Sequence, residues 1–228
     1  MKYLHLLLTA GAFTVASVSG QIIATGINNG GFEDDDSGDP PSGWSLNEVG
    51  GSITVSDEYA FAGSNSLAID STGAGDWAVP NAFQSFPATP GAEYSLSGYM
   101  FMPDSDPITD ASFGIFKIEF QDSGGTILDV AGLVTTGTAA GGPFFGAESD
   151  PQLNSGSASD TWVFSEAVVT APAGAASVGF YLLNVNQGIN PTTIYFDSVT
   201  AIPEPATFAL IGGLLALGLV MYRRRRRA

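Results

Sequence analysis

The sequence predicts an all-β fold, an antiparallel β-sandwich, between two apolar ends. Short runs rich in apolar, aromatic and β-branched residues alternate with polar residues at a period of two, which is typical of half-buried strands. Clusters of Gly, Pro, Asp and Ser separate most of these runs, and no amphipathic helix of useful length is visible outside the ends. About nine to eleven short strands with such spacing favour two packed antiparallel sheets.

The expected strands each have one apolar face. In residues 112–121, positions 116, 118 and 120 are Phe, Ile and Phe, whereas positions 117, 119 and 121 are Lys, Glu and Gln. In residues 193–201, Ile194 and Phe196 oppose Tyr195, Asp197 and Val199. In chain order, the expected strands are residues 21–27, the stretch around 53–55, 66–70, 82–86, 93–102, 112–121, 161–170, 177–184 and 193–201.

Residues 137–160 do not fit this pattern. They are rich in Gly, Ser, Ala and Asp and contain few apolar anchors. We therefore expect a long surface loop there, and loops of that length are often functional.

The N-terminus has the features of a secretory signal peptide. Lys2 precedes an apolar stretch over residues 4–18, which ends in small residues up to Gly20. We expect residues 1–20 to be this signal, with cleavage near Gly20; a buried first helix is the alternative. Because His5 is the only histidine and the chain has no cysteine, the mature protein would lack Ser-His-Asp catalysis, Cys-His catalysis and His- or Cys-ligated zinc.

The expected domain, residues 21–202, is strongly acidic. It carries 22 acidic residues and a single basic one, Lys117, a formal charge of −21. Such a surface repels phosphate backbones, so we expect no nucleic-acid partner. A glycosidase needs only two carboxylates, and among 22 acidic residues no single pair stands out as such a site. The sequence also contains no Gly-rich phosphate-binding loop and no nucleophile elbow. We therefore expect no enzymatic activity.

The C-terminal segment, residues 203–228, has the composition of a membrane anchor. An apolar run over 206–222 contains 17 residues, about 25 Å as a helix, near the lower limit for a span. Arg223–Arg227 follow it directly and would lie on the cytoplasmic side, leaving residues 21–202 outside the inner membrane. A buried soluble helix is the alternative, although five arginines directly behind it are hard to place in a core.

This segment resembles the PEP-CTERM sorting signal, in which Pro-Glu-Pro precedes a span and a basic tail. Pro203, Glu204 and Pro205 match the motif. The resemblance implies a Gram-negative bacterium with an exopolysaccharide locus and an exosortase, a membrane peptidase that cuts near the motif. It implies that these three residues are recognised by the exosortase and are not catalytic, that the anchor is transient, and that the protein reaches the cell surface or the extracellular matrix.

The body of the chain resembles the galactose-binding-like jelly rolls and, among them, the carbohydrate-binding modules attached to xylanases and glucanases. The likeness covers roughly residues 25–201 and implies a jelly-roll β-sandwich. It rests on the short motifs Asn29-Gly30-Gly31-Phe32-Glu33, Gly43-Trp44, Ala62-Gly63-Ser64-Asn65-Ser66-Leu67 and Ile194-Tyr195-Phe196-Asp197-Ser198-Val199, in that order.

The resemblance also implies a structural calcium ion between the first and last strands. Carried over by position, Glu33 and Asp197 supply carboxylates, and backbone carbonyls near Ser64 and Asn65 complete the shell. Hard oxygen ligands of this kind suit calcium. The alternative is that Glu33 belongs to a solvated acidic loop and Asp197 to an exposed strand face.

A carbohydrate ligand would require exposed aromatic side chains, because pyranose rings stack on aromatic faces. Trp44 and Trp162 match packing positions of the resembled family, so we expect both in the core. Trp77 lies between Gly-Asp and Pro in an expected loop and is the candidate ligand-binding residue, with edge packing of a strand as the alternative. Phe144 and Phe145 form a second exposed candidate.

Three functions remain open on these observations. The first is a matrix or surface protein that binds polysaccharide. The second is a structural surface or biofilm component without a small ligand. The third is a secreted glycan hydrolase, which two well-placed carboxylates would suffice to create.

Overall fold

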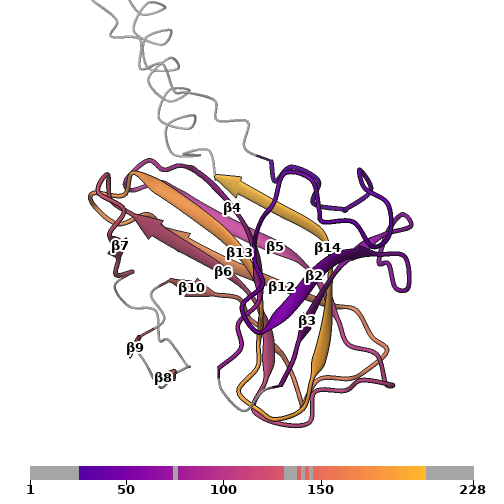
Figure 1. Cartoon of the computed structure of the whole chain (residues 1–228). Helices are drawn as coiled ribbons and strands as arrows, with labels where there is room; N and C mark the ends of the chain where they lie inside the picture. The colour runs from indigo at the N-terminus through magenta and orange to yellow at the C-terminus, as the bar shows by residue number, and fades with distance from the viewer. Residues whose placement is uncertain (1–25, 74–76, 131–137, 140–141, 144–145, 204–228) are drawn as a thin grey trace, which may run out of the picture.

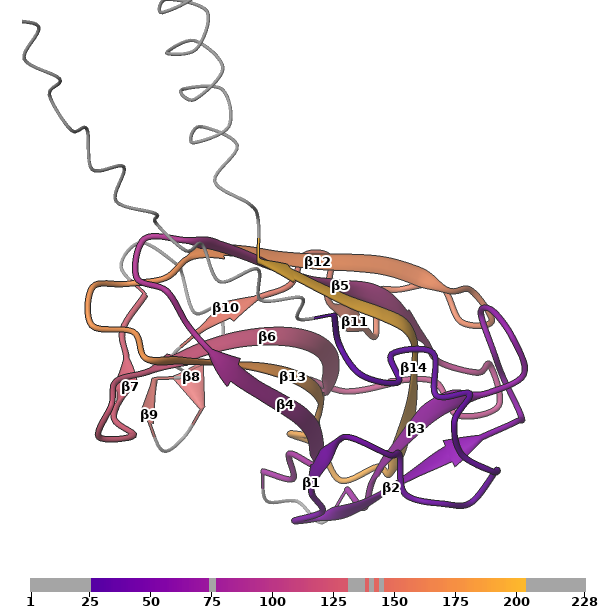
Figure 2. The ribbon, with the colours of Figure 1, turned by 90° about the horizontal axis from the view of Figure 1, so that it is seen from above.

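The computed structural model describes residues 26–73, 77–130, 138–139, 142–143 and 146–203. Over these residues the fold is all-β, with two antiparallel sheets packed as two layers and no helix (Figures 1 and 2). The expected antiparallel sandwich is thereby confirmed. The predicted signal peptide, the candidate pair Phe144 and Phe145, and the predicted span with its arginine tail lie outside the described residues.

The first sheet, sheet A, has seven strands. Its order is β1-β4-β13-β6-β10, and β7 and β11 also pair with β6. Figure 2 shows its long strands in the lower layer. The bounds are β1 (Ser45–Asn47), β4 (Asn81–Pro87), β6 (Phe113–Gln121), β7 (Ile127–Leu128), β10 (Ala147–Glu148), β11 (Leu153–Asn154) and β13 (Ser177–Val185).

The second sheet, sheet B, has five strands in the order β12-β5-β14-β3-β2. A separate two-stranded sheet joins β8 (Thr138–Ala139) to β9 (Gly142–Pro143). The bounds of sheet B are β2 (Gly51–Ser56), β3 (Ser66–Ser71), β5 (Glu93–Phe101), β12 (Val163–Thr170) and β14 (Thr192–Pro203).

The core lies between the two sheets and follows the expected alternation. Side chains of alternate residues point to opposite faces of a strand, so the apolar set of each strand meets the other sheet. The fully buried side chains include Phe116 and Phe120 of β6, Phe180 of β13 and Phe196 of β14. The same alternation sends the polar residues at 117, 119 and 121 to the outer face of sheet A.

A β-bulge in β14 corrects one expectation. The register of β14 against β5 shifts between Asp197 and Thr200, and Ser198 has a φ of 52°. A bulge inserts an extra residue and so exchanges the two faces of the strand beyond it. Val199, which alternation placed beside Tyr195, is therefore buried in the core, while Ile202 is on the outer face with 53% exposure.

The expected surface loop over residues 137–160 is also corrected. The segment contributes short strands: β8 pairs with β9, and β10 and β11 both pair with β6. Ala147 and Leu153 are 1% and 0% exposed and belong to the main core. These two isolated apolar residues suffice to anchor the segment, which is why its composition gave so weak a strand signal.

The two tryptophans expected in the core differ. Trp44 is 8% exposed and packs beside Phe32, with ring centroids 5.7 Å apart, as expected. Trp162 instead packs against Phe101 in a cluster separate from the main core, with centroids 5.0 Å apart. Outward residues of β5 belong to the outer face of sheet B, so Trp162 lies there and not between the sheets.

Within the described residues, no helix has the length and apolarity of a membrane span.

Candidate functional site

The outward side chains of β4, β6 and β13 form a surface that we call the sheet A face. Tyr181 of β13 lies at its centre, because its Cα pairs with Phe83 of β4 on one side and Lys117 of β6 on the other. Two residues away on β13, on the same face, Gly179 pairs with Glu119. Residues remote in sequence are thus brought together by strand register.

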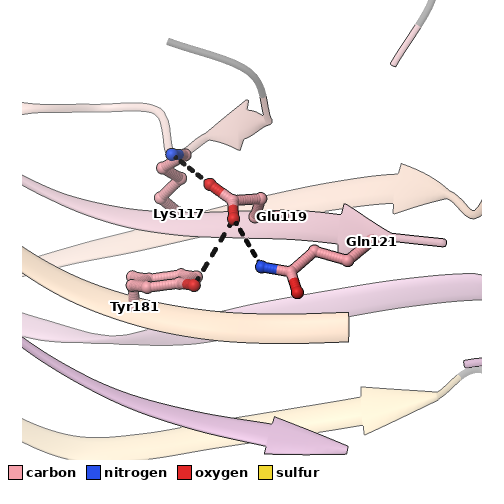
Figure 3. Close-up of polar contacts among 4 residues, drawn as sticks. All are labelled: Lys117, Glu119, Gln121 and Tyr181. Atoms are coloured by element: carbon pink, nitrogen blue, oxygen red, sulfur yellow. Dashed lines mark hydrogen bonds and ion pairs between the residues drawn. The ribbon is translucent and has the colours of Figure 1, made fainter. Parts of the chain in front are cut away.

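A polar network occupies the β6 side of this face (Figure 3). Lys117 Nζ lies 2.8 Å from Glu119 Oε2, an ion pair between residues two apart on one strand. The other carboxylate oxygen, Glu119 Oε1, accepts from Gln121 Nε2 at 3.3 Å and from the Tyr181 hydroxyl at a long 3.5 Å. Glu119 therefore contacts each of the other three side chains.

The ion pair is nearly buried although it lies outside the core. The side chains of Lys117 and Glu119 are only 9% and 8% exposed. Part of the cover is the chain at Gly146, where a Cβ would come within 2.8 Å of the Lys117 Cε. Desolvating two charges costs free energy that their attraction barely repays, so buried pairs are rarely there for stability alone. The only basic residue among those described is held in this pair.

An aromatic pair lies beside the network. The rings of Phe83 and Tyr181 stack at 5.1 Å between centroids and 21° between planes, and both side chains are half-buried. The Tyr181 ring lies over Gly179, where a Cβ would approach its Cε2 to 2.6 Å. A glycine inside a strand often marks such close approach. Lys117 Nζ is 5.5 Å from the centroid of the same ring, within cation–π range.

The environment of Tyr181 stabilises its neutral form. Burial is the largest cause, and the negative charge of Glu119 together with its hydrogen bond adds to it, so the pKa of Tyr181 rises to about 12. The hydroxyl is therefore a neutral hydrogen-bonding group at any physiological pH.

Trp77 lies at the apolar end of the sheet A face. It is half-buried and packs against a cluster of Phe113, Ile115, Leu183 and Val185, the same cluster that Tyr181 contacts. Trp77 therefore packs on the side chains of β6 and β13 and borders the same surface as Tyr181. Its role in ligand binding stays a prediction.

The residues expected to bind calcium converge on one loop between β2 and β3. Asp197 is fully buried, and its Oδ2 accepts from the backbone N–H groups of Phe61 and Ala62 at 2.7 and 2.9 Å. Its other oxygen accepts from the N–H of Ser198. Burial is the largest influence on the pKa of Asp197 and raises it, although these N–H groups oppose the shift. The exposed strand position considered for Asp197 is therefore wrong.

Glu33 meets the same loop from the other end of the chain. Its Oε1 accepts from the N–H groups of Ser64 and Asn65 at 2.9 and 2.8 Å. Gly63, with a φ of 71°, passes close against this carboxylate, and a Cβ there would collide with it. The loop thus binds both carboxylates through backbone donors.

This geometry fits the expected calcium ion only in part. Glu33 and Asp197 do meet at one loop and offer hard oxygens, as calcium prefers. Ser64 and Asn65, however, direct N–H groups rather than carbonyls at Glu33. Among the described residues, no group of three or more His, Asp or Glu is arranged to hold a metal. Calcium binding at Glu33 and Asp197 stays a prediction.

Two site residues, Phe83 and Tyr181, were not foreseen in the sequence. Alternation placed Lys117, Glu119 and Gln121 on one face, but the strands beside β6 could not be known without the sheet order. The spacing Gly179-Phe180-Tyr181 is the one local signal, since a glycine two residues before an outward tyrosine leaves room for its ring.

The likeness of this chain to known proteins is one of fold. No protein-family model matches the chain, and no curated protein sequence does. Among solved structures, the Stig cyclase Fisc from Fischerella sp. TAU is 16% identical with a TM-score of 0.54, and the match covers 79% of this chain and 96% of that one. The arabinose-bound α-L-arabinofuranosidase MgGH51 is 16% identical with a TM-score of 0.53, covering 78% of this chain.

A carbohydrate-binding module is also similar. The xylan-binding CBM22-1 domain of Xyn10C from Paenibacillus barcinonensis is 16% identical with a TM-score of 0.47, covering 71% of this chain and 86% of that domain. The chain spans only 26% of the arabinofuranosidase. At these identities the likeness is one of fold, and the chemistry must be argued from the side chains of this chain.

Proposed function

We propose that the sheet A face binds a neutral polysaccharide and that the protein is a non-catalytic component of the cell surface or extracellular matrix. The observation that carries this proposal is the half-buried ring pair of Tyr181 and Phe83 beside the Lys117–Glu119–Gln121 network. The sandwich fold shared with carbohydrate-binding modules is compatible with it.

The chemistry of the face suits a sugar. A pyranose ring has an apolar C–H face, which packs on an aromatic ring, and hydroxyl groups around its edge. Binding sites for such molecules combine aromatic walls with a few fixed polar groups. Here the rings of Tyr181 and Phe83 supply the wall, while the Glu119 carboxylate and the Gln121 amide lie beside it. The network holds these groups in place before a ligand arrives, which lowers the entropic cost of binding.

The charge of the protein favours a neutral ligand. Residues 21–202 carry a formal charge of −21, and the one lysine is already paired with Glu119. An anionic polysaccharide would meet repulsion from the whole domain. A neutral polymer meets none.

Export and sorting complete the proposal and are supported by the sequence alone. The signal peptide over residues 1–20 would deliver the chain through the inner membrane. The PEP-CTERM segment, 203–228, would hold it there through residues 206–222 until an exosortase cuts near Pro203-Glu204-Pro205. A matrix protein that binds polysaccharide would then act at the cell surface or beyond it.

A glycan array tests this function directly. We expect the purified protein to bind a subset of neutral glycans, and Trp77→Ala to weaken binding if that side chain borders the ligand. Val49→Ala is the matched control, since Val49 is 72% exposed and lies outside the sheet A face. Glycan binding in Tyr181→Ala that is as tight as in the wild type would reject the site, and binding to no glycan would favour a purely structural component. Release of reducing sugars from a bound glycan would reject the non-catalytic role.

A further inference from the structure

The outer face of sheet B carries a chain of aromatic rings that the proposed function does not use. Phe61, from the loop between β2 and β3, stacks on Tyr99 of β5 with centroids 3.5 Å apart and planes 14° apart. Tyr99 meets Phe164 of β12 edge to face at 5.4 Å. Trp162 lies 6.0 Å from Phe61 and continues the chain towards Phe101. We call Phe61, Tyr99 and Phe164 the sheet B platform.

The rings of the platform are exposed to solvent, whereas aromatic rings that only stabilise a fold are normally buried. Phe61 is 43% exposed and Phe164 50%. Two further exposed apolar side chains lie on the same face, Val168 of β12 at 45% and Ile202 of β14 at 53%. The rings of Phe61, Tyr99 and Phe164 are contiguous, and contiguous exposed apolar surface on a protein commonly marks a binding site.

The position of Phe61 is fixed from below by a buried carboxylate. Asp197 is on the outward side of β14 and is fully buried under the loop between β2 and β3. Its carboxylate accepts hydrogen bonds from the N–H groups of Phe61 and Ala62. A charge-assisted hydrogen bond to a buried carboxylate is stronger than a neutral one. The loop therefore holds the Phe61 ring against Tyr99, so the platform is formed before any ligand binds.

A polar band crosses the same face beside the platform. Ser97 of β5 pairs with Glu166 of β12 on one side and with Thr200 of β14 on the other. The hydroxyl oxygens of Ser97 and Thr200 are 3.0 Å apart and lie at the surface, and Glu166 is exposed. This band separates the platform from Val168 and Ile202, so that apolar and hydroxyl surfaces alternate along the strands.

The charge and layout of the face determine its partner. It has no basic side chain among the described residues, and Glu166 lies within it, so an anionic polymer would be repelled. A second copy of this chain carries the same formal charge of −21 over residues 21–202 and would be repelled as well. A lipid surface requires continuous apolar area, which the polar band interrupts. A neutral polymer with apolar faces and hydroxyl edges matches both the rings and the band.

We propose that the sheet B platform is a second binding face for a neutral polysaccharide, on the opposite side of the sandwich from the sheet A face. Phe61 and Phe164 stack against sugar rings, and Ser97, Thr200 and Glu166 hydrogen-bond to hydroxyls. The inference deepens the proposed function, on which it rests for the class of ligand. Because the faces belong to different sheets, one molecule engages two polymer chains at once, and two linked sites bind a polymer more tightly than either alone.

The test is affinity electrophoresis of the purified full chain in gels that contain soluble arabinoxylan, mixed-linkage β-glucan or galactomannan. The variants are Phe164→Ala and Phe61→Ala for sheet B, Tyr181→Ala for sheet A, the double variant Phe164→Ala/Tyr181→Ala, and Val49→Ala as the control. Turbidity of protein–polysaccharide mixtures measures cross-linking in parallel. Thermal midpoints measure folding, which Phe164→Ala leaves nearly intact because the side chain is half exposed.

We expect at least one polysaccharide to retard the wild type and Val49→Ala equally. Each variant that alters only one face should keep part of that retardation but produce no turbidity. The double variant should show neither retardation nor turbidity. Wild-type retardation and turbidity in Phe164→Ala and Phe61→Ala would overturn the second face. Complete loss in Tyr181→Ala alone would overturn it too, because one face would then account for all binding. Complete loss in Phe164→Ala, with Tyr181→Ala unchanged, would reject the sheet A proposal and leave the platform as the site. Binding to phosphatidylcholine vesicles but to no polysaccharide would also overturn the inference.

Discussion

Lys117 Nζ lies 2.8 Å from Glu119 Oε2 on the outer side of a sheet, and both side chains are less than a tenth exposed. Such a pair is expensive to desolvate, and the same two positions could hold apolar residues at lower cost. Its presence beside two stacked rings is what distinguishes the sheet A face from an ordinary solvent-exposed strand surface. The pair orders Glu119, and through it Gln121 and Tyr181.

Removing one partner of the pair should destabilise the protein strongly. Lys117→Met leaves the Glu119 carboxylate nearly buried without its counterion, and we predict a loss of about 3 kcal/mol in the free energy of unfolding. Glu119→Gln leaves Lys117 uncompensated in the same way. Urea denaturation of each variant, followed by fluorescence, measures this loss.

The double variant Lys117→Met/Glu119→Gln controls for simple side-chain loss. Because neither charge then remains, we predict that it is more stable than the sum of the single variants implies, with a coupling of about 1–3 kcal/mol. Strictly additive losses would show that the ion pair does not act as a unit.

The Tyr181 hydroxyl should lose its proton only at high pH, and this ionisation should lower the stability of the folded protein. Its folded pKa of about 12 lies above the ordinary value of 10.0, so the folded state holds the phenolic proton more tightly than the unfolded chain does. Its contribution to stability is then complete below pH 10 and is lost as the pH rises from 10 through 12. Absorbance of tyrosinate, wild type minus Tyr181→Phe, isolates this group.

Glu119→Gln tests the cause of that shift. The variant removes the negative charge but not the burial, so we predict that the pKa of Tyr181 falls while staying above 10. A pKa that is unchanged in Glu119→Gln would mean that the two side chains do not interact in solution.

The sequence predicted the sandwich and the faces of its long strands because burial between two sheets imposes a period of two. It predicted that Lys117, Glu119 and Gln121 share a face for the same reason. Their neighbours Tyr181 and Phe83 could not be predicted, because β13 and β4 are placed beside β6 only by the sheet order. A contact that depends on register between strands leaves no local pattern in the sequence.

Two residues show where alternation itself fails. Val199 moved into the core because the bulge after Asp197 adds one residue to β14, and no Gly or Pro marks that bulge. Trp162 was expected in the core because it matches a packing position of the resembled family, yet it packs on the outer side of sheet B. Other rings on that side, from Phe101 and Phe61, offer it a second apolar surface.

Calcium should stabilise the protein if Glu33 and Asp197 hold it. At a calcium concentration of about 100 times the dissociation constant, linkage predicts about 2.7 kcal/mol of added stability, or roughly 5–10 °C in the thermal midpoint. The measurement compares midpoints with calcium and with a chelator, in the wild type and in Glu33→Gln. Asp34→Asn, a neighbour in the same acidic loop, is the control. A midpoint that calcium and chelator leave unchanged would count against the site.

The mature protein should be shorter than its gene product at both ends. We predict that the natural protein begins near Gln21, after removal of the signal, and ends near Pro203, after exosortase cleavage. Intact mass of the protein from membrane and extracellular fractions gives both termini. A chain that ends at Ala228 in every fraction would contradict release and leave a permanent anchor.

The central claim is that the Tyr181 ring is a stacking surface for polysaccharide, and Gly179→Ala tests it most directly. The three atoms nearest to a Cβ at position 179 all belong to the far end of the Tyr181 side chain, so the Cβ should displace the ring without removing it or unfolding the sheet. The measurement is calorimetric titration of an oligosaccharide from the bound polysaccharide, made in a Phe164→Ala background so that only sheet A contributes. We predict that Gly179→Ala and Tyr181→Ala each weaken binding at least tenfold, about 1.4 kcal/mol, while both proteins remain folded at the temperature of the titration. Undiminished affinity in both variants would contradict the claim.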